Sequence, residues 1–279
     1  MRARRAAGVL AALLAAGCAG GPRPTAVGPV VVPEHRPGVS VGYVDAPGFD
    51  SRALLPAPPA PDSAARALDE AIARRALALR ETPRWRQAVI DADLDFPQAA
   101  DLYACALGVP IDTAHTPHLV RLLRRSLADA AIDGRAAKQH WQRRRPFLAN
   151  GAPVCTPGDA ARLRDSGSYP SGHTAIGWTW ALALTALAPD RADPLLQRGR
   201  SFGESRLVCN VHWYSDVVQG QLVGAATFAR LQAEPAFLAD LAAAREEVAA
   251  QRARGARPEG CDAQTAALRV SPLPTADDR

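Results

Sequence analysis

The residues of this chain whose types and spacing could do chemistry lie in three short segments. Lysine and arginine carry positive charges that suit a tetrahedral oxyanion such as phosphate, and arginine adds a planar fork of donors. A histidine oriented by a carboxylate keeps one ring nitrogen free to attack an electrophile, and a second histidine can exchange a proton with the leaving group. The segments supply these types in chain order: Lys138 and Arg145, then Ser171, Gly172 and His173, then Arg206, His212 and Asp216.

The middle segment, Ser166–Thr174, precedes a long apolar run. Pro170 can occupy the first turn of a helix, because its fixed φ suits the helix and its missing N–H costs nothing there. We therefore expect Ser171, Gly172 and His173 to present free backbone N–H groups at a helix N-terminus, where an anion is stabilised. Gly172 leaves room for a ligand to approach the backbone. Taken alone, the stretch is equally typical of an ordinary capped helix.

The two flanking segments also have ordinary structural explanations when each is taken alone. Lys138 and Arg145 are two helical turns apart and could share one helix face, but with the arginines directly before Arg145 they are also typical of a solvated basic face. His212 and Asp216 are four residues apart, so on one helical turn the carboxylate could accept a hydrogen bond from the imidazole ring. Only the combination of all three segments favours phosphoryl transfer.

In order and spacing the three segments resemble the signature of the type 2 phosphatidic acid phosphatase superfamily. The stretch Gly167–Thr174 further resembles the bacterial class A non-specific acid phosphatases, as do Leu55–Pro59, Thr82–Trp85 and Gly203–Arg206. The likeness covers roughly residues 41–252. It implies an all-α, single-domain helical bundle of the acid phosphatase/vanadium haloperoxidase type.

The same resemblance implies an activity and a role for each residue. It implies broad hydrolysis of small-molecule phosphate monoesters at acid pH, with no metal and no other cofactor, through a phosphohistidine intermediate. His212 would be the nucleophile, Asp216 would orient it, and His173 would protonate the leaving alcohol and then activate water. The phosphoryl oxygens would be held by Lys138, Arg145, Ser171, Gly172 and Arg206. A homodimer is also implied.

Three alternatives remain open on the sequence. A vanadium-dependent haloperoxidase uses a very similar constellation to hold vanadate, although the flanking stretches favour a phosphatase. A lipid phosphatase that resembles the integral enzymes of the superfamily would need several membrane spans, and no apolar run after residue 18 is long enough for one. A catalytically silent lipoprotein that binds phosphate is disfavoured by the intact His173, His212 and Asp216.

The elements that must position these residues are predicted to be helices. The chain is 48% hydrophobic but only 5% aromatic and is rich in alanine, which favours helix over strand. We find no convincing strand alternation and no internal repeat. The apolar run after residue 173 is too short to span a membrane, so it is expected to be the buried central helix of the bundle. Helices are predicted at about 63–80, 85–92, 99–107, 117–133, 135–144, 159–164, 174–188, 193–206, 215–233 and 237–252.

The N-terminus predicts export. Residues 1–18 combine three arginines, a short apolar run and Gly17-Cys18, as in a signal peptide. Cys18 also resembles a lipoprotein processing site, so a lipid-anchored and a free periplasmic form are both expected outcomes. The three arginines supply three of the five formal positive charges, and no basic stripe with interleaved aromatics follows, so no nucleic-acid partner is expected. The predicted organisation is a signal (1–18), a proline-rich leader (19–40), a catalytic domain (41–256) and a C-terminal tail (257–279).

The remaining cysteines predict disulfides. Four cysteines in an exported protein suggest two bridges, and three pairings are open. Cys155 and Cys209 lie close in sequence to the proposed site segments, so this pairing is preferred, which leaves Cys105 with Cys261. None of the four has the spacing of metal ligands.

Overall fold

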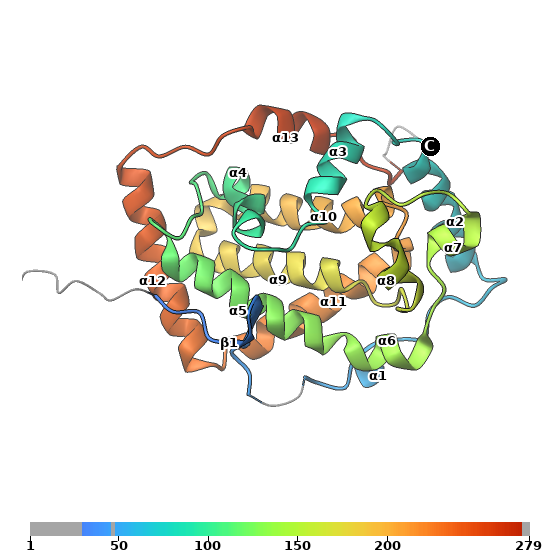
Figure 1. Cartoon of the computed structure of the whole chain (residues 1–279), viewed down its shortest axis with the longest axis horizontal. Coiled ribbons are helices and arrows are strands. Elements are labelled where there is room, and N and C mark those ends of the chain that lie inside the picture. Colours follow the sequence, from blue (N-terminus) through green and yellow to red (C-terminus); the bar gives the residue numbers. More distant parts are fainter. Residues whose placement is uncertain (1–29, 46–47, 275–279) are drawn as a thin grey trace, which may run out of the picture.

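Helix α9, Gly172–Leu187, runs through the middle of the molecule, and four other long helices contact it (Figure 1). Its side chains are almost wholly apolar, and those of Ala175, Trp180 and Leu184 are buried. A helix with no polar face must be enclosed by other elements. The helices that enclose it are α5 (Pro117–Asp133), α10 (Ala192–Val208), α11 (Tyr214–Leu231) and α12 (Pro235–Ala253).

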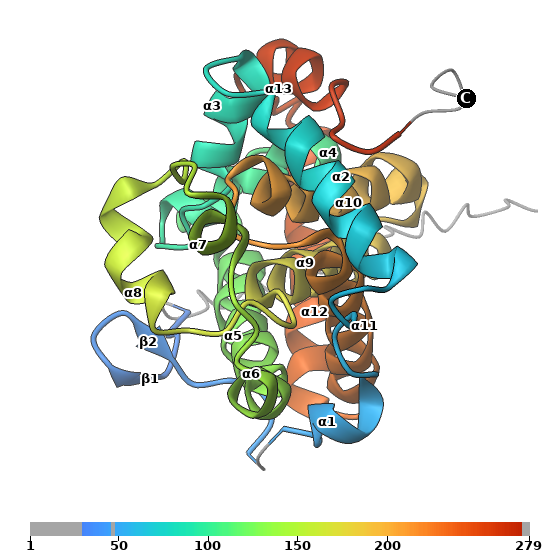
Figure 2. The same ribbon diagram turned by 90° about the vertical axis from the view of Figure 1, so that its right-hand side faces the viewer.

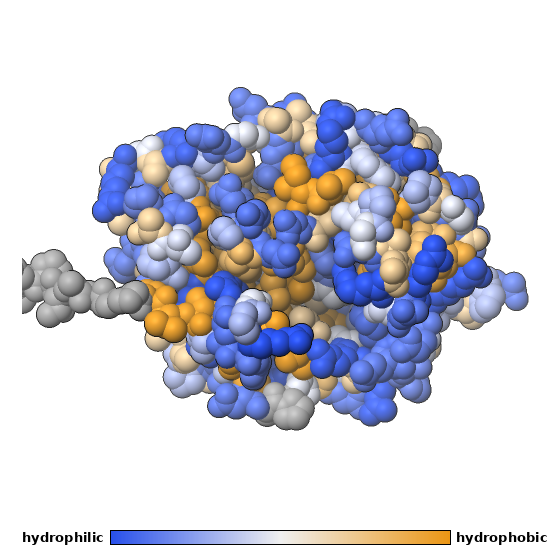
Figure 3. Space-filling view, in the orientation of Figure 1, coloured by the Kyte–Doolittle hydropathy of each residue, from blue (hydrophilic) through white to orange (hydrophobic). Residues whose placement is uncertain are grey.

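The computed structural model describes residues 30–45 and 48–274, and within them it confirms the all-α fold class. The one sheet of this part is a hairpin of two short antiparallel strands, β1 (Glu34–Arg36) and β2 (Val39–Ser40). Hydrophilic residues dominate the face drawn in Figure 3, and apolar ones gather near its centre. The shorter helices are α1 (Ser51–Leu54), α2 (Ala64–Leu77), α3 (Pro83–Ile90), η1 (Gln98–Tyr103), α4 (Ala104–Leu107), α6 (Arg135–Trp141), α7 (Pro146–Asn150), η2 (Pro157–Asp159), α8 (Ala160–Arg164), η3 (Pro189–Arg191) and α13 (Cys261–Leu268).

One end of the bundle gathers the segments that matter for function. Helices α9 and α11 begin there and α10 ends there, with α2, α6, α7 and α8 around them (Figure 2). Gly220 lets α11 approach the start of α9, because a Cβ at this position would lie 2.6 Å from the carbonyl oxygen of Ser171. The backbone N–H of Ser171 in turn donates to the carbonyl oxygen of Asp216 at 3.0 Å. The first turns of α9 and α11 are therefore locked together.

Chain segments on both sides of the bundle are held to it, over the residues described. At the N-terminal side, the backbone N–H groups of Tyr43 and Val44 donate to the carboxylate of Asp129 on α5, so the chain that follows the hairpin is fixed to the bundle. At the C-terminal side, residues 261–268 form α13, and Oγ of Ser271 donates to Glu204 at 3.0 Å. A disulfide and polar contacts therefore hold the described part of the predicted tail to the bundle.

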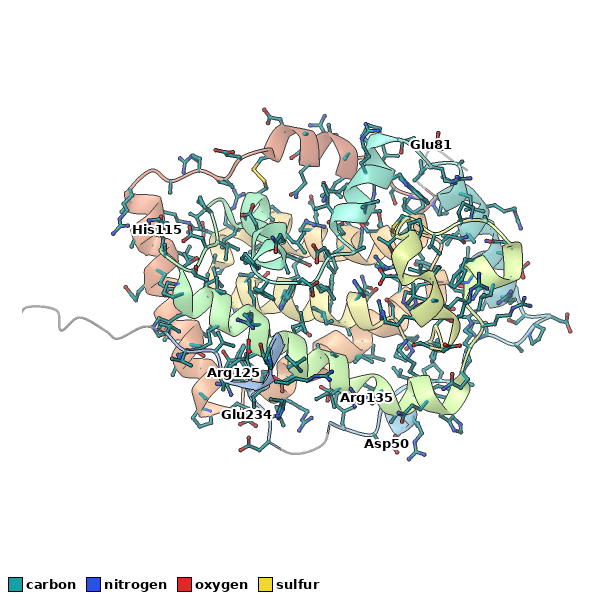
Figure 4. All side chains as sticks on the ribbon, in the orientation of Figure 1. Asp50, Glu81, His115, Arg125, Arg135 and Glu234 are labelled. Carbon is teal, nitrogen blue, oxygen red and sulfur yellow. A yellow bond between two sulfur atoms is a disulfide. The ribbon has the colours of Figure 1, made fainter. Side chains whose placement is uncertain are left out.

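Two disulfides join distant parts of the chain. Cys155 is bonded to Cys209, the pairing that the sequence favoured, and Cys105 is bonded to Cys261. The second bridge lies beneath α13 and is drawn in yellow in Figure 4. It connects α13 to α4, which explains why a short helix at the end of the chain keeps a fixed position.

The predicted export signal and Cys18 lie outside the described residues. Among residues 30–45 and 48–274, none of the helices combines the length and hydropathy that a membrane crossing requires.

Candidate active site

Lys138 and Arg145 lie on different elements, so they do not share a helix face, which was one of the two possibilities that their spacing left open. Helix α6 ends at Trp141, because Gln142 takes a left-handed conformation with φ of 41°. The chain after it is extended, and Arg145 is the N-cap residue of α7. The break turns Arg145 inward, where it is 3% exposed, so both cations still reach the same site from two elements.

The two cations also hold the loop that leads into α9. Nζ of Lys138 donates to the carbonyl oxygens of Gly167 at 2.9 Å and Pro170 at 2.7 Å. Nε of Arg145 donates to the carbonyl oxygens of Leu163 at 3.0 Å and Ser166 at 2.9 Å. Burial and the neighbouring charge of Arg145 lower the pKa of Lys138 to about 7. Lys138 is therefore fully charged only below neutral pH.

The start of α9 differs by two residues from the expectation. Pro170 precedes the N-cap instead of occupying the first turn, and the N-cap is Ser171, whose Oγ accepts from the backbone N–H of Thr174 at 3.3 Å. Gly172 is the first helical residue, and a Cβ placed on it would meet nothing within 4 Å. The expected helix N-terminus with open space above a glycine is thus present. The backbone N–H of Ser171, which was expected to be free, donates to the carbonyl oxygen of Asp216, so the N–H groups of Gly172 and His173 and the helix dipole are left to favour an anion in that space.

His212 and Asp216 form a pair at the start of α11. His212 precedes the helix and Asp216 lies in its first turn. Nδ1 of His212 is 3.4 Å from Oδ2 of Asp216, a close contact of opposite polarity that does not reach hydrogen-bond geometry. On the other side of the ring, Nη1 of Arg145 lies 3.2 Å from Nε2. Because a guanidinium can only donate, Nε2 must be the acceptor, and the ring proton of the neutral form is on Nδ1, facing the carboxylate. The lone pair of Nε2 is therefore directed toward the cations.

The charges around His212 are unbalanced. Burial, and after it the charges of Arg145, Lys138 and Arg206, lower the pKa of His212 well below its ordinary value. Nε of Arg206 is buried and has no hydrogen-bond partner among the described residues. A buried guanidinium N–H without a partner is costly, and a bound oxyanion would satisfy it. The arrangement suits an oxyanion such as phosphate.

His173 lies on the first turn of α9, beside a pocket. Its Nε2 donates to the carbonyl oxygen of Ala92 at 3.0 Å, which leaves Nδ1 to exchange a proton. Burial and, after it, the charge of Arg206 lower the pKa of His173 to about 3. The pocket has a volume of about 750 Å³ and lies between the chain after α3 and helix α8. Its lining includes His173, Ile90, Leu94, Asp95 and Asp159.

Two residues at the site were not predicted. Arg143, expected on a solvated basic face, is buried and forms ion pairs with Asp216 and with Asp69 of α2, both at 2.6 Å. The early end of α6 is again the cause, since it points Arg143 inward. Asp69 gave no motif signal, although its spacing from Ile72 and Ala76 places all three on the buried face of α2.

No group of three or more histidine, cysteine, aspartate or glutamate residues among residues 30–45 and 48–274 is placed to hold a metal ion. The expectation that catalysis needs no metal stays a prediction.

Comparison with known proteins identifies the family. The PAP2 superfamily profile matches residues 122–233, which contain all eight predicted site residues. An acid phosphatase of Zymomonas mobilis is 40% identical over 210 residues, which cover 75% of this chain and 80% of that protein. The non-specific acid phosphatase of Salmonella typhimurium is 40% identical over 219 residues, covering 78% and 84%. That of Providencia stuartii is 40% identical over 202 residues, covering 72% and 82%. The chain therefore belongs to the PAP2 superfamily and, within it, to the non-specific acid phosphatases.

Proposed function

We propose that this acid phosphatase family member hydrolyses a broad range of phosphate monoesters through a phosphohistidine on His212. The observation that carries the proposal is the orientation of the His212 ring. Nε2, which lacks a proton, faces the guanidinium of Arg145, and Nδ1 faces the carboxylate of Asp216. A nucleophile must present its lone pair where the phosphoryl oxygens are held, and this ring does so.

The first step transfers the phosphoryl group to the enzyme. Nε2 of His212 attacks phosphorus in line with the ester oxygen, the P–O bond breaks, and the leaving oxygen takes a proton from His173. Lys138, Arg145 and Arg206 stabilise the charge on the equatorial oxygens, together with the backbone N–H groups at the start of α9. The products of this step are the alcohol and phosphorylated His212, with the Nδ1 proton still facing Asp216.

The second step releases phosphate. His173 now takes a proton from a water molecule, whose oxygen attacks phosphorus while the P–N bond to His212 breaks. Inorganic phosphate leaves, and both histidines return to their initial protonation states. One residue thus serves as acid and then as base, which the reversal of the reaction path requires.

The low pKa of His173 is compatible with its role as acid only in the complex. In the empty site, burial and Arg206 hold this pKa at about 3. A bound phosphate ester brings negative charge close to the ring and offsets the charge of Arg206, so it raises the pKa. Substrate binding therefore creates the protonated His173 that the first step consumes.

The test is hydrolysis of a chromogenic phosphomonoester at acid pH in excess chelator, combined with an alkaline quench, in which a phosphohistidine is stable, and 31P NMR of the phosphorylated enzyme under alkaline conditions. His212→Ala should lower kcat on the order of 10³-fold or more and abolish the phosphohistidine signal. The matched control is His140→Ala, because His140 is an exposed histidine on α6. Full activity of His212→Ala would refute the nucleophile, and loss of wild-type activity with chelator alone would refute metal independence.

The haloperoxidase alternative is not favoured, because the relatives described above are named acid phosphatases. Halide oxidation by the protein supplied with vanadate and peroxide would revive it. Periplasmic export, with or without a lipid on Cys18, and a homodimer belong to the same proposal. Two disulfides support export, since such bonds persist in oxidising compartments.

A further inference from the structure

Arg143 connects two buried carboxylates behind the site. Its Nη1 donates to Oδ1 of Asp216 and its Nη2 donates to Oδ2 of Asp69, each at 2.6 Å. The side chains of Arg143, Asp69 and Asp216 are 7%, 1% and 0% exposed. Hydrogen bonds between opposite charges at this distance and degree of burial are strong and directional, so the guanidinium has one well-defined position.

Asp69 fixes Arg143 from a helix outside the region that matches the superfamily. Besides Arg143, its carboxylate accepts from the backbone N–H and from Oγ of Ser215, both at 2.7 Å. Oγ of Ser215 also accepts from Nη1 of Arg143 at 2.7 Å. Helix α2 is therefore attached both to Arg143 and to the first turn of α11, which carries Asp216.

The two oxygens of Asp216 have different partners. Oδ1 accepts from Arg143, whereas Oδ2 accepts from the backbone N–H of Trp213 at 2.7 Å and faces Nδ1 of His212. Arg143 thus determines which oxygen remains for the histidine and the direction in which it points. The contacts form one chain from Asp69 through Arg143 and Asp216 to His212.

We propose that Arg143, held by Asp69, is a positioning residue that keeps Asp216 ionised and directed at Nδ1 of His212. The inference rests on the proposed role of His212 as nucleophile. An ionised carboxylate at Nδ1 holds the proton there and stabilises the positive ring that forms as Nε2 bonds to phosphorus. A neutral Asp216, or one turned away, would do neither.

Arg143 is also the strongest charge acting on Asp216. Burial raises the pKa of Asp216, and the guanidinium of Arg143 opposes this more than any other charge does, with Lys138 contributing less. An opposite charge at this distance is worth about 1 to 3 pKa units. The titratable and charged groups that face Asp216, directly or through Arg143, are Lys138 of α6, Arg143 and Arg145 before α7, Tyr169 before α9, His212 before α11 and Asp69 of α2.

With Arg143→Gln the folded enzyme loses the charge that lowers the pKa of Asp216, so this pKa rises and Asp216 becomes protonated at a higher pH. The acid limb of kcat/KM should therefore move upward by about 1 to 3 pH units, and kcat should fall about 10- to 100-fold. Arg143→Lys keeps a charge, so its acid limb should stay near that of the wild type while kcat falls.

The experiment measures kcat and KM from pH 3 to 8 for Arg143→Gln, Arg143→Lys and Asp69→Asn, with the folded fraction determined by circular dichroism at each pH. The matched controls are Arg144→Gln and Glu70→Gln, which make the same changes at exposed neighbouring positions. Asp69→Asn should lower kcat with KM within about twofold, because it loosens Arg143 without touching the phosphate site.

Two results would overturn the inference. One is an acid limb of Arg143→Gln that coincides with the wild type, since a merely structural role lowers the amount of active enzyme without shifting a pKa. The other is wild-type kcat in both Arg143→Lys and Asp69→Asn, which applies even if Arg143→Gln does not fold. An active His212→Ala would instead refute the proposed nucleophile, so the two failures are distinguishable.

Discussion

The substitution Gly172→Ala should weaken binding of the phosphoryl group without lowering the stability of the fold. Gly172 is the first residue of α9, and the methyl group of alanine would meet no atom within 4 Å in the ligand-free protein. Alanine at a compatible backbone position reduces the entropy of the unfolded chain and stabilises by about 0.4–1 kcal/mol. For a chain of this size that corresponds to a rise in Tm of about 1–4 °C.

The same methyl group should obstruct the substrate. A phosphoryl oxygen that accepts from a backbone N–H lies about 2.9 Å from the nitrogen, whereas it can approach a methyl carbon no closer than about 3.3 Å. If the open space at Gly172 is where the phosphoryl group lies, the group must shift by several tenths of an ångström to about 1 Å. Misplacement on that scale costs about 10²-fold, so kcat/KM should fall about 10- to 100-fold.

The assay compares Tm by calorimetry with kcat/KM and with the inhibition constant of inorganic phosphate, which should rise about 10-fold or more. Gly158→Ala is the matched control, because a methyl group there also meets nothing within 4 Å and the residue is exposed. Wild-type kcat/KM and phosphate inhibition in Gly172→Ala would show that the phosphoryl group lies elsewhere. A clear loss of stability would contradict the open space.

Three further outcomes are expected. Lys138, whose pKa is about 7, loses its charge as the pH rises through that value, while the substrate is already a dianion. Wild-type kcat/KM should therefore fall about tenfold per pH unit above pH 7, and in a pH profile Lys138→Arg should move this basic limb to higher pH. Replacing Cys155 and Cys209, 54 residues apart, by serine should cost about 4 kcal/mol of unfolding free energy, measured by denaturant titration, whereas retained stability would contradict the bridge. Gly220→Ala should lower both Tm and kcat, because its methyl group would collide with the carbonyl of Ser171.

Much of the site was predictable because its members lie in short motifs. The sequence identified the start of α9 to within two residues and placed His212 beside Asp216, and both results rest on local features: a helix cap and a spacing of four. The fold class followed from alanine content and apolar periodicity in the same way. Predictions from such local patterns hold in the folded protein, because residues that are neighbours in the chain remain neighbours in space.

What was missed depends on contacts between distant segments. No glycine or proline lies between α6 and Pro146, so the sequence predicts a helix as far as Arg144. In the structure the helix ends at Trp141, because Gln142 takes a left-handed conformation. On α2 the apolar Leu68 is 44% exposed, whereas the buried face carries Asp69. A carboxylate on a buried helix face has no explanation until its arginine partner is known, and that partner lies 74 residues away.

The charge distribution of the site explains why such a phosphatase would be active at acid pH although the pKa values of its two histidines are lowered. Three cations surround His212, while Asp216, the carboxylate that contacts its ring among residues 30–45 and 48–274, is shared with Arg143. Burial and, after it, this excess of positive charge lower the pKa of Lys138 to about 7 and that of His173 to about 3, so the site resists further protonation. A phosphate ester supplies the missing negative charge, and proton uptake by His173 is then coupled to binding. Low pH therefore favours the productive complex through His173 and keeps Lys138 charged, so the acid range would be a property of the enzyme–substrate complex.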